Sequence, residues 1–387
     1  MADVEYFIKG ALWLSAGQVI STFIAGVTSI VLARLLGPDG YGLYSLSIST
    51  AGLLAVFSWF GVDQAAIRGA SREGGAAGRI LDVAVTFSVL NAVSLLVVGV
   101  LASRVLAYAV DRPWVSQAVA AASVSVASGV LFSSSGLLTA AGRPDVPAKA
   151  GVVLQLLRGF LVPGLALYLG FYGAVLGHSI SYLLASAAVL GFYVRVMGGW
   201  RPSLEGLGGM LLFGVPLWLP SVLAMFVGFA RAVVMGHVLS NGEIGEFSVA
   251  MNFVALMGVL VTPMSSMALP YISMANNSEE EALRHVVRVS AFLATPVAVF
   301  SMLYAAPLVE LFYGKAYLGA SGVLMILTLQ YMLCLGGSVG LGQYLVAKGL
   351  NRAVLEASAL GSLVQLAALY PLVLALRSQG VALAIVA

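Results

Sequence analysis

The sequence predicts an all-α, polytopic membrane protein, and three observations support this fold class. The chain has 387 residues, of which 60% are hydrophobic and only 9% are charged, whereas a soluble domain carries about 25% charged residues. The apolar residues form continuous runs of about 20, which is the length that crosses a hydrocarbon core as a helix. The runs do not alternate with polar residues, as the strands of a membrane barrel do. Lipid is therefore expected to cover most of the surface.

Eleven complete spans are predicted. The first run follows Asp3 and Glu5 instead of a basic segment, so we interpret it as a retained span and not as a signal peptide. A twelfth run begins at Gly380 and continues for too few residues to cross a core about 30 Å thick. We therefore expect either a truncated chain or a terminal stub, that is, an incomplete last helix. The predicted spans are 10–33, 41–62, 81–103, 114–140, 150–170, 173–194, 209–239, 245–272, 287–308, 318–346 and 353–376.

The loops between the predicted spans are short, and their positive charges orient the chain. Cytoplasmic loops are enriched in Lys and Arg. If the N-terminus is cytoplasmic, the inner loops hold twelve of these residues and the outer loops hold five, so the chain is predicted to lie in the plasma membrane with its N-terminus inside. The inner set is Lys9, Arg68, Arg72, Arg79, Arg143, Lys149, Arg195, Arg201, Arg284, Arg288, Lys348 and Arg352, and the outer set is Arg34, Arg104, Arg112, Lys315 and Arg377.

The two halves of the chain resemble each other. Residues 35–46 can be laid on residues 238–249 so that Gly42 coincides with Gly245, an offset of 203 positions. Near the end of each half, Gly173 similarly matches Gly380. Six predicted spans lie between the matching points, so both copies enter the membrane in the same direction. The alternative is that apolar sequences share Leu and Gly by chance. We expect two lobes, residues 1–200 and 201–387.

The segment Ala33–Tyr44 resembles the first loop of the polysaccharide transporter (oligosaccharide flippase) family, within the multidrug/oligosaccharidyl-lipid/polysaccharide exporter superfamily. Further similar motifs are Phe213–Leu217, Gly245–Ala250 and Leu311–Tyr317. The resemblance implies two pseudo-symmetric six-helix lobes around a central cavity. It also implies a flippase that moves lipid-pyrophosphate-linked oligosaccharides from the cytoplasmic to the outer leaflet. Family members often carry an acid or a Lys in the seventh span, where this sequence has Arg231.

Two arginines lie within predicted spans, where a charge is costly and is a functional candidate. Arg231 has apolar neighbours on both sides. In a wet cavity it could bind a phosphate through a bidentate pair of hydrogen bonds, and the resemblance places the seventh span along the transport path. Arg158 lies nearer the cytoplasmic start of its predicted span. For both residues, the alternative is a side chain that snorkels to the headgroups or pairs near a helix end.

Other polar residues near the spans complete the candidate set. His178 is interpreted either as a buried neutral imidazole or as a proton-coupling group. Gln18 and Gln64 are candidates for lining the cavity. Arg68 and Arg72 are placed at the inner mouth, where they either attract an anionic headgroup or satisfy the charge rule alone. At the outer mouth, the candidates are Arg34 and His237, which are otherwise interfacial anchors.

The favoured function is a flippase that works by alternating access during the assembly of cell-surface polysaccharide. Its predicted partners are a polyprenyl-linked oligosaccharide, membrane lipids and glycan-assembly proteins, with no nucleic acid. No cofactor, metal or enzymatic activity is expected, although a Na⁺ or H⁺ gradient can drive such a transporter. A multidrug or cation antiporter of the same superfamily is the first alternative, although every Asp and Glu falls at a span end or in a loop. A polytopic enzyme of glycan assembly is the second, and it usually needs a larger outer loop.

Overall fold

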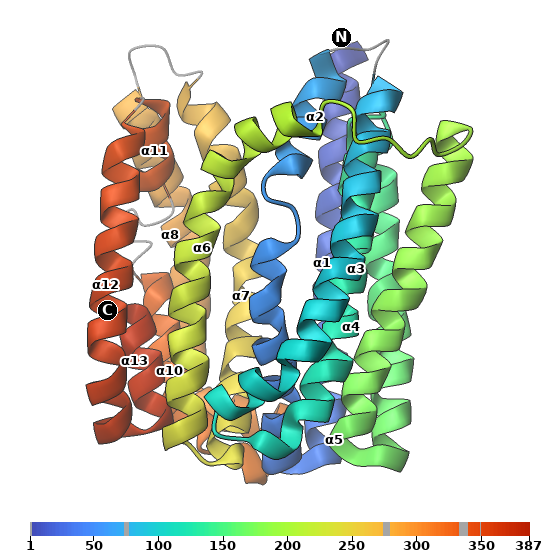
Figure 1. The fold of residues 1–387 in the computed structure, drawn as a ribbon. Helices are drawn as coiled ribbons and strands as arrows, with labels where there is room; N and C mark the ends of the chain where they lie inside the picture. Colours follow the sequence, from blue (N-terminus) through green and yellow to red (C-terminus); the bar gives the residue numbers. More distant parts are fainter. Residues whose placement is uncertain (1, 73–76, 274–278, 333–339, 349) are drawn as a thin grey trace. The chain divides into compact units, whose positions relative to one another are not determined.

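The structure is a computed structural model that describes residues 2–72, 77–273, 279–332, 340–348 and 350–387. The regular secondary structure of these residues is helical and contains no strand (Figure 1). The backbone contacts divide the chain into two compact units. The first comprises Met1–Leu35 and Leu43–Gly236, and the second comprises Leu36–Gly42 and His237–Ala387. The all-α prediction is confirmed.

In the first unit, α3, α4 and α5 pack in sequence against one another (Figure 1). Small residues allow helices to approach closely in a membrane, and Gly99 of α3 faces Ser123 of α4 in such a contact. The elements that begin in this unit are α1 (Ala2–Gly52, which also runs through Leu36–Gly42), η1 (Leu53–Phe57), α2 (Val62–Arg72), α3 (Ala77–Ala109), η2 (Pro113–Val115), α4 (Ser116–Ser133), η3 (Ser134–Thr139), α5 (Asp145–Met197) and α6 (Leu207–Val238).

In the second unit, α10 packs against α7, α8 and α13, and α12 packs against α13. The tenth predicted span corresponds to α10 and α11, and residues 333–339 between them lie outside the described part of the chain. The elements are α7 (Asn241–Ser273), α8 (Glu279–Leu303), α9 (Ala305–Tyr313), η4 (Lys315–Tyr317), α10 (Ala320–Met332), α11 (Leu341–Ala347), α12 (Asn351–Leu376) and α13 (Ser378–Val386).

Among the described residues, seven helical segments are long and apolar enough to cross a membrane. Two of them, with 45 and 53 residues, exceed by far the roughly 20 residues of one crossing. Each contains a glycine with non-helical backbone angles, Gly37 in α1 and Gly170 in α5. Each therefore holds two of the predicted spans. The chain is a multi-pass membrane protein.

The second predicted span, 41–62, is broken near its end. Phe60 and Gly61 have positive φ angles of 49° and 77°, and α2 starts directly afterwards where a loop was expected. Side chains satisfy the carbonyl groups that the break releases. Asn91 donates to the carbonyl oxygens of Phe57 and Ser58. Irregular backbone at membrane depth is tolerated where protein supplies such partners.

The helix α6 belongs to the first unit by its contacts, although it lies beyond residue 200. Near its start, Gly214 packs against the backbone of Gly61 so closely that neither position has room for a Cβ atom. Trp218 donates from Nε1 to the carbonyl oxygen of Val56 at 2.6 Å. The predicted division into lobes at residue 200 follows the internal repeat and stays a prediction.

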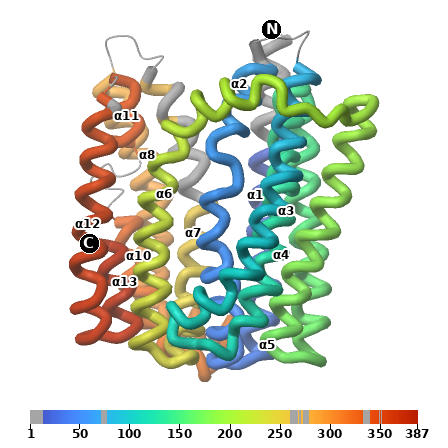
Figure 2. The backbone as a smooth tube through the Cα atoms, viewed as in Figure 1, coloured from blue at the N-terminus to red at the C-terminus, as the bar shows by residue number. Residues whose placement is uncertain are grey.

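The chain reverses direction with the same backbone conformation at two places, within α5 and between α12 and α13. Gly170 has φ 57° and ψ −140°, and Arg377 has φ 55° and ψ −131°. Three residues after each turn a glycine, Gly173 or Gly380, packs on the carbonyl group of a leucine eight positions earlier. Figure 2 shows the chain turning back within α5 in the green segment. These paired turns agree with the predicted repeat.

Candidate functional site

The α5 hairpin brings two of the predicted site residues together in the first unit. Its two arms approach closely because Gly173 lies on the carbonyl group of Leu165 and Gly177 lies on that of Leu161. A side chain at either glycine would separate the arms. Their spacing is the small-xxx-small pattern that packs membrane helices. It sets Arg158 on the first arm beside His178 on the second.

Arg158 and His178 form a buried polar cluster with Tyr44 of α1. The Tyr44 hydroxyl lies 3.1 Å from Nδ1 of His178 and forms a hydrogen bond with it. The Arg158 guanidinium is within hydrogen-bonding reach of the same hydroxyl and donates from Nη1 to Oε1 of Gln155 at 3.0 Å. The Tyr182 ring lies 5.1 Å from the His178 ring, centroid to centroid. Tyr44 and His178 are each only 7% exposed.

Arg158 lies near the middle of the first arm of α5. It is 13 residues after the start of α5 and 12 residues before Gly170, which places it about 20 Å from either end of this arm. The sequence analysis placed it nearer the cytoplasmic end of its span. Both a cavity role and a side chain that snorkels to the headgroups stay predictions for Arg158.

The positive charge of Arg158 has no counter-ion in the described part of the protein. Its hydrogen-bond partners there, Tyr44 and Gln155, are neutral, and its Nε is buried with no hydrogen-bond partner. An uncompensated charge in a low-dielectric interior costs several kcal/mol. An anion that reached Arg158 would offset that cost, so the cluster is suited to binding a phosphate group.

Arg231 of α6 is a second cation without a counter-ion in the first unit. Its side chain is half-buried, and no hydrogen bond or ion pair with the described residues holds its guanidinium. It lies seven residues before the end of α6, or about 10 Å. This position leaves open both the cavity role and a side chain that reaches toward the outer headgroups.

A pocket of about 710 Å³ opens among α2, α3, α6 and the segment before α6. Three arginines line it, namely Arg68, Arg79 and Arg201. Arg68 stacks on the Phe213 ring, with its guanidinium carbon 4.4 Å from the centroid. Two carboxylates, Asp82 and Glu205, also line the pocket. That of Asp82 accepts hydrogen bonds from the Tyr193 hydroxyl and the Arg201 backbone N–H. The pocket is therefore suited to an anionic group.

The remaining predicted site residues lie outside the buried Arg158 cluster. Gln18 donates to Thr22 at 3.3 Å, and Gln64 donates to Asp63 at 3.4 Å. Arg34 and His237 are exposed near helix ends. Arg72 is the last residue of α2, and its side chain lies outside the described part of the structure. The roles of these five positions stay predictions.

Sequence reasoning did not single out Tyr44, Gln155, Arg79 or Arg201 as site residues. The first two lie within apolar spans, and the other two were counted only for the orientation of the chain. The sequence nevertheless contains a pattern that indicates the cluster. The Gly173–Gly177 spacing after a predicted turn implies that two arms pack closely, and it points to the residues that face each other across them.

Solved structures of membrane transporters share this helical architecture. A lipid II flippase, MurJ, in an inward closed conformation aligns with a TM-score of 0.82 at 16% identity, covering 97% of this chain and 84% of that one. An inward-facing multidrug resistance transporter of the MATE family aligns with a TM-score of 0.69 at 19% identity, covering 98% and 90%. These likenesses concern the fold.

The family follows from the sequence comparison. The chain belongs to the polysaccharide biosynthesis protein family, whose model matches residues 31–322. A putative O-antigen transporter of Shigella flexneri is 19% identical over 329 residues, which are 80% of this chain and 77% of that protein. The expected resemblance to polysaccharide transporters is confirmed.

Proposed function

We propose that this protein flips a lipid-pyrophosphate-linked oligosaccharide from the cytoplasmic to the outer leaflet of the plasma membrane by alternating access. The observation that carries the proposal is the Arg158 cluster, a cation near the middle of an apolar helix arm without a counter-ion among the described residues. A pyrophosphate is the part of such a substrate that an arginine binds best, because the planar guanidinium matches its oxygens in bidentate geometry.

The second support is the distribution of further cations in the same unit. Arg231 lies toward the C-terminal end of α6, and its guanidinium has no hydrogen bond or ion pair with the described residues. The pocket of Arg68, Arg79 and Arg201 offers positive charge at the predicted cytoplasmic side. In our proposal the cytoplasmic pocket attracts the anionic headgroup and the two span arginines hold it during passage. The N-terminus is cytoplasmic in this scheme, and a Na⁺ or H⁺ gradient can drive the cycle.

The test is translocation in vesicles that contain the purified chain and a fluorescent lipid-linked oligosaccharide. Arg158→Gln is expected to slow translocation about tenfold to a hundredfold, the loss of one charge-assisted hydrogen-bond set. Arg158→Lys keeps the charge and is expected to retain part of the activity. Arg104→Gln, at an exposed position of α3, is the matched control. Full translocation by the Arg158→Gln protein would overturn the proposal.

A cation antiporter is the main alternative within this fold, and the buried residues argue against it. Binding a proton or a cationic drug within the membrane calls for a buried carboxylate. Among the described residues Asp82 is the one carboxylate in the buried class, and Tyr193 already donates to it at 2.9 Å. Drug-driven proton release from reconstituted vesicles would favour the antiporter, and its absence would favour the flippase.

A further inference from the structure

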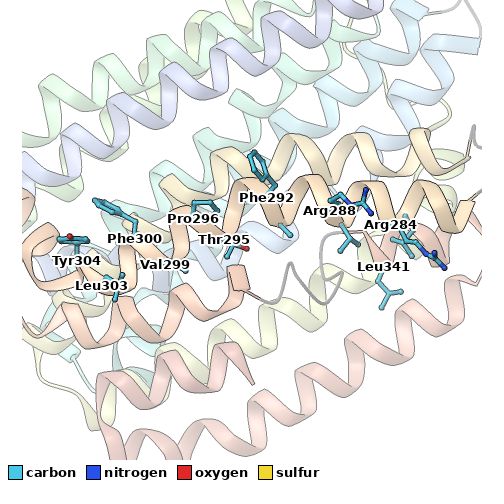
Figure 3. A pocket seen from close by; sticks show the side chains of 13 residues that line it. Arg284, Arg288, Phe292, Thr295, Pro296, Val299, Phe300, Leu303, Tyr304 and Leu341 are labelled. Atoms are coloured by element: carbon cyan, nitrogen blue, oxygen red, sulfur yellow. The ribbon is translucent and has the colours of Figure 1, made fainter.

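The end of the second predicted span contains a break that its own sequence does not require. Breaks in membrane helices are often caused by proline, and residues 53–62 contain none. Helix α8 carries Pro296 and still continues without interruption from Glu279 to Leu303 (Figure 3). Between η1 and α2, by contrast, Phe60 adopts a φ angle of 49°, which is strained for a residue with a large side chain. Contacts with other helices therefore hold this conformation.

Three consecutive carbonyl groups before the break accept hydrogen bonds from side chains of two other helices. Trp218 of α6 donates from Nε1 to the carbonyl oxygen of Val56 at 2.6 Å. Asn91 of α3 donates from Nδ2 to the carbonyl oxygens of Phe57 and Ser58. In a continuous helix the same three oxygens would accept from the backbone N–H groups four residues further along the chain. The two side chains therefore take the place of three backbone donors, and a continuous helix would satisfy the same oxygens without them.

Helix α6 packs directly on the break. The Trp218 ring lies 5.0 Å from the Phe60 ring and 6.2 Å from the Phe57 ring, centroid to centroid. Gly214, one turn earlier on α6, packs on the backbone of Gly61 with no room for a Cβ atom at either position. If the start of α6 withdrew, the broken form would lose one donor and these contacts, whereas the strain at Phe60 would remain. The balance between a broken and a continuous helix therefore depends on α6.

We propose that residues 57–61 form a two-state hinge, which is broken while the start of α6 rests on it and becomes helical when α6 withdraws. A few residues that absorb a large change in φ and ψ are typical of hinges. The hinge sets the direction of α2, which begins at Val62 directly after it. Arg68 of α2 stacks on Phe213 of α6, so the same withdrawal would separate two walls of the arginine-lined pocket. The hinge does not depend on which substrate is carried, so it stands or fails separately from the proposed function.

The test is a distance measurement across the hinge by pulsed electron paramagnetic resonance. Spin labels are attached through Gly52→Cys and Gln64→Cys, both at exposed positions, in a purified chain whose one cysteine is removed by Cys334→Ser. From position 52 to position 64 a continuous helix rises about 18 Å. The positive φ angles of the broken form change the direction of the chain between the labels and give a second distance. We expect the broken distance to dominate in the unmodified hinge.

Two substitutions at adjacent positions are expected to shift the populations in opposite directions. Gly61→Ala adds a methyl group that has no room beside Gly214 in the broken form, and alanine favours a helix. We expect the ratio of broken to helical form to fall about tenfold. Val62→Pro is compatible with the first residue of α2 but not with the interior of a continuous helix, so it is expected to abolish the helical population.

The side-chain donors are tested in the same way. Trp218→Phe keeps an aromatic ring and removes the N–H group, and Asn91→Leu removes both donors of the amide. Each is expected to lower the ratio of broken to helical form about fivefold to tenfold. Ser94→Ala, one turn further along α3, removes a hydroxyl that bonds within its own helix, and it is the matched control with an unchanged ratio. Adding Val62→Pro to Trp218→Phe is expected to restore the broken distance.

The outcomes separate a hinge from a fixed element of the fold. Size-exclusion chromatography selects folded protein, so distances are compared only between intact variants. A helical distance that appears in Gly61→Ala and Trp218→Phe and disappears with Val62→Pro supports the hinge. A single distance shared by the unmodified hinge and these variants would overturn the proposal, even if the unfolding midpoint of the variants fell.

Discussion

Gly42 and Gly245 pack against each other in a reciprocal contact. A Cβ atom on Gly42 would collide with the carbonyl oxygen of Asn241, and a Cβ atom on Gly245 would collide with that of Pro38. The two pairs are related by the same offset of 203 residues that aligns the halves of the sequence. Such an exchange of equivalent contacts is what a two-fold relationship between like surfaces produces. The turn of each repeat is therefore a packing partner of the other.

This contact predicts that Gly245→Ala is destabilising. The added methyl group has no room beside the Pro38 carbonyl, so the backbone has to shift, at a cost of about 1–3 kcal/mol. We expect the midpoint of thermal unfolding in detergent to fall by several degrees. Gly52→Ala is the control, because nothing lies within 4 Å of the atom it adds. Equal midpoints for the two variants would show that the turns are not tightly packed.

Tyr44→Phe tests the buried cluster. The change removes the hydroxyl that bonds Nδ1 of His178 and leaves a buried ring nitrogen unpaired, which costs about 1–3 kcal/mol. It also takes one neutral partner from Arg158. We expect a lower unfolding midpoint and slower translocation. Tyr168→Phe, at a residue that is 85% exposed, is expected to change neither. A Tyr44→Phe protein with unaltered stability and transport would contradict the cluster geometry.

Two substitutions at Arg377 distinguish the contribution of its side-chain ion pair from the contribution of its backbone conformation. Both Arg377→Ala and Arg377→Gly remove the ion pair with Glu243, in which Arg377 donates to both carboxylate oxygens at 2.9 and 2.7 Å. Only glycine adopts the φ angle of 55° without strain. We therefore expect Arg377→Gly to be more stable than Arg377→Ala, by about 1 kcal/mol in the free energy of unfolding. The reverse order would show that the turn conformation is not strained.

The Glu243–Arg377 pair also predicts a pH dependence. Burial raises the pKa of Glu243, but hydrogen bonds from Arg377 and Ser240 outweigh it, so the net pKa is lowered. A lowered folded-state pKa gives stability that is present above the unfolded pKa of about 4.3 and is lost as the pH falls through the folded value.

Glu243→Gln is therefore expected to lower the unfolding midpoint at pH 7, with a difference from the unmodified chain that shrinks below about pH 4. Thermal scans from pH 7 to pH 3 measure this. Glu356→Gln, whose pair with Arg352 is largely exposed, is expected to have a smaller effect. A difference for Glu243→Gln that is the same at all pH values would mean that the ion pair does not form.

The functional candidates show where sequence reasoning reaches its limit. Arg158 was recognised because a charge within an apolar run is conspicuous at any depth. The helix that carries Arg158, α5, starts at Asp145, ahead of the predicted span, and the depth of Arg158 in the membrane stays a prediction. Its meeting with Tyr44 depends on how separate helices pack, and no local pattern around Tyr44 signals it. The helix break at Phe60 and Gly61 likewise depends on a distant residue, because Asn91 of α3 donates a hydrogen bond to a carbonyl group beside it.

The sequence alone determined the membrane class and the order of most helical segments, and it predicted the repeat. These features rest on local composition and on a comparison of the chain with itself, because a run of apolar residues needs lipid wherever it lies. Only the tertiary structure decided which charged groups are left without partners. Whether Arg158 meets a neutral tyrosine or a carboxylate is set by contacts between residues more than a hundred positions apart. Those contacts form only when glycines such as Gly173 let the helices approach.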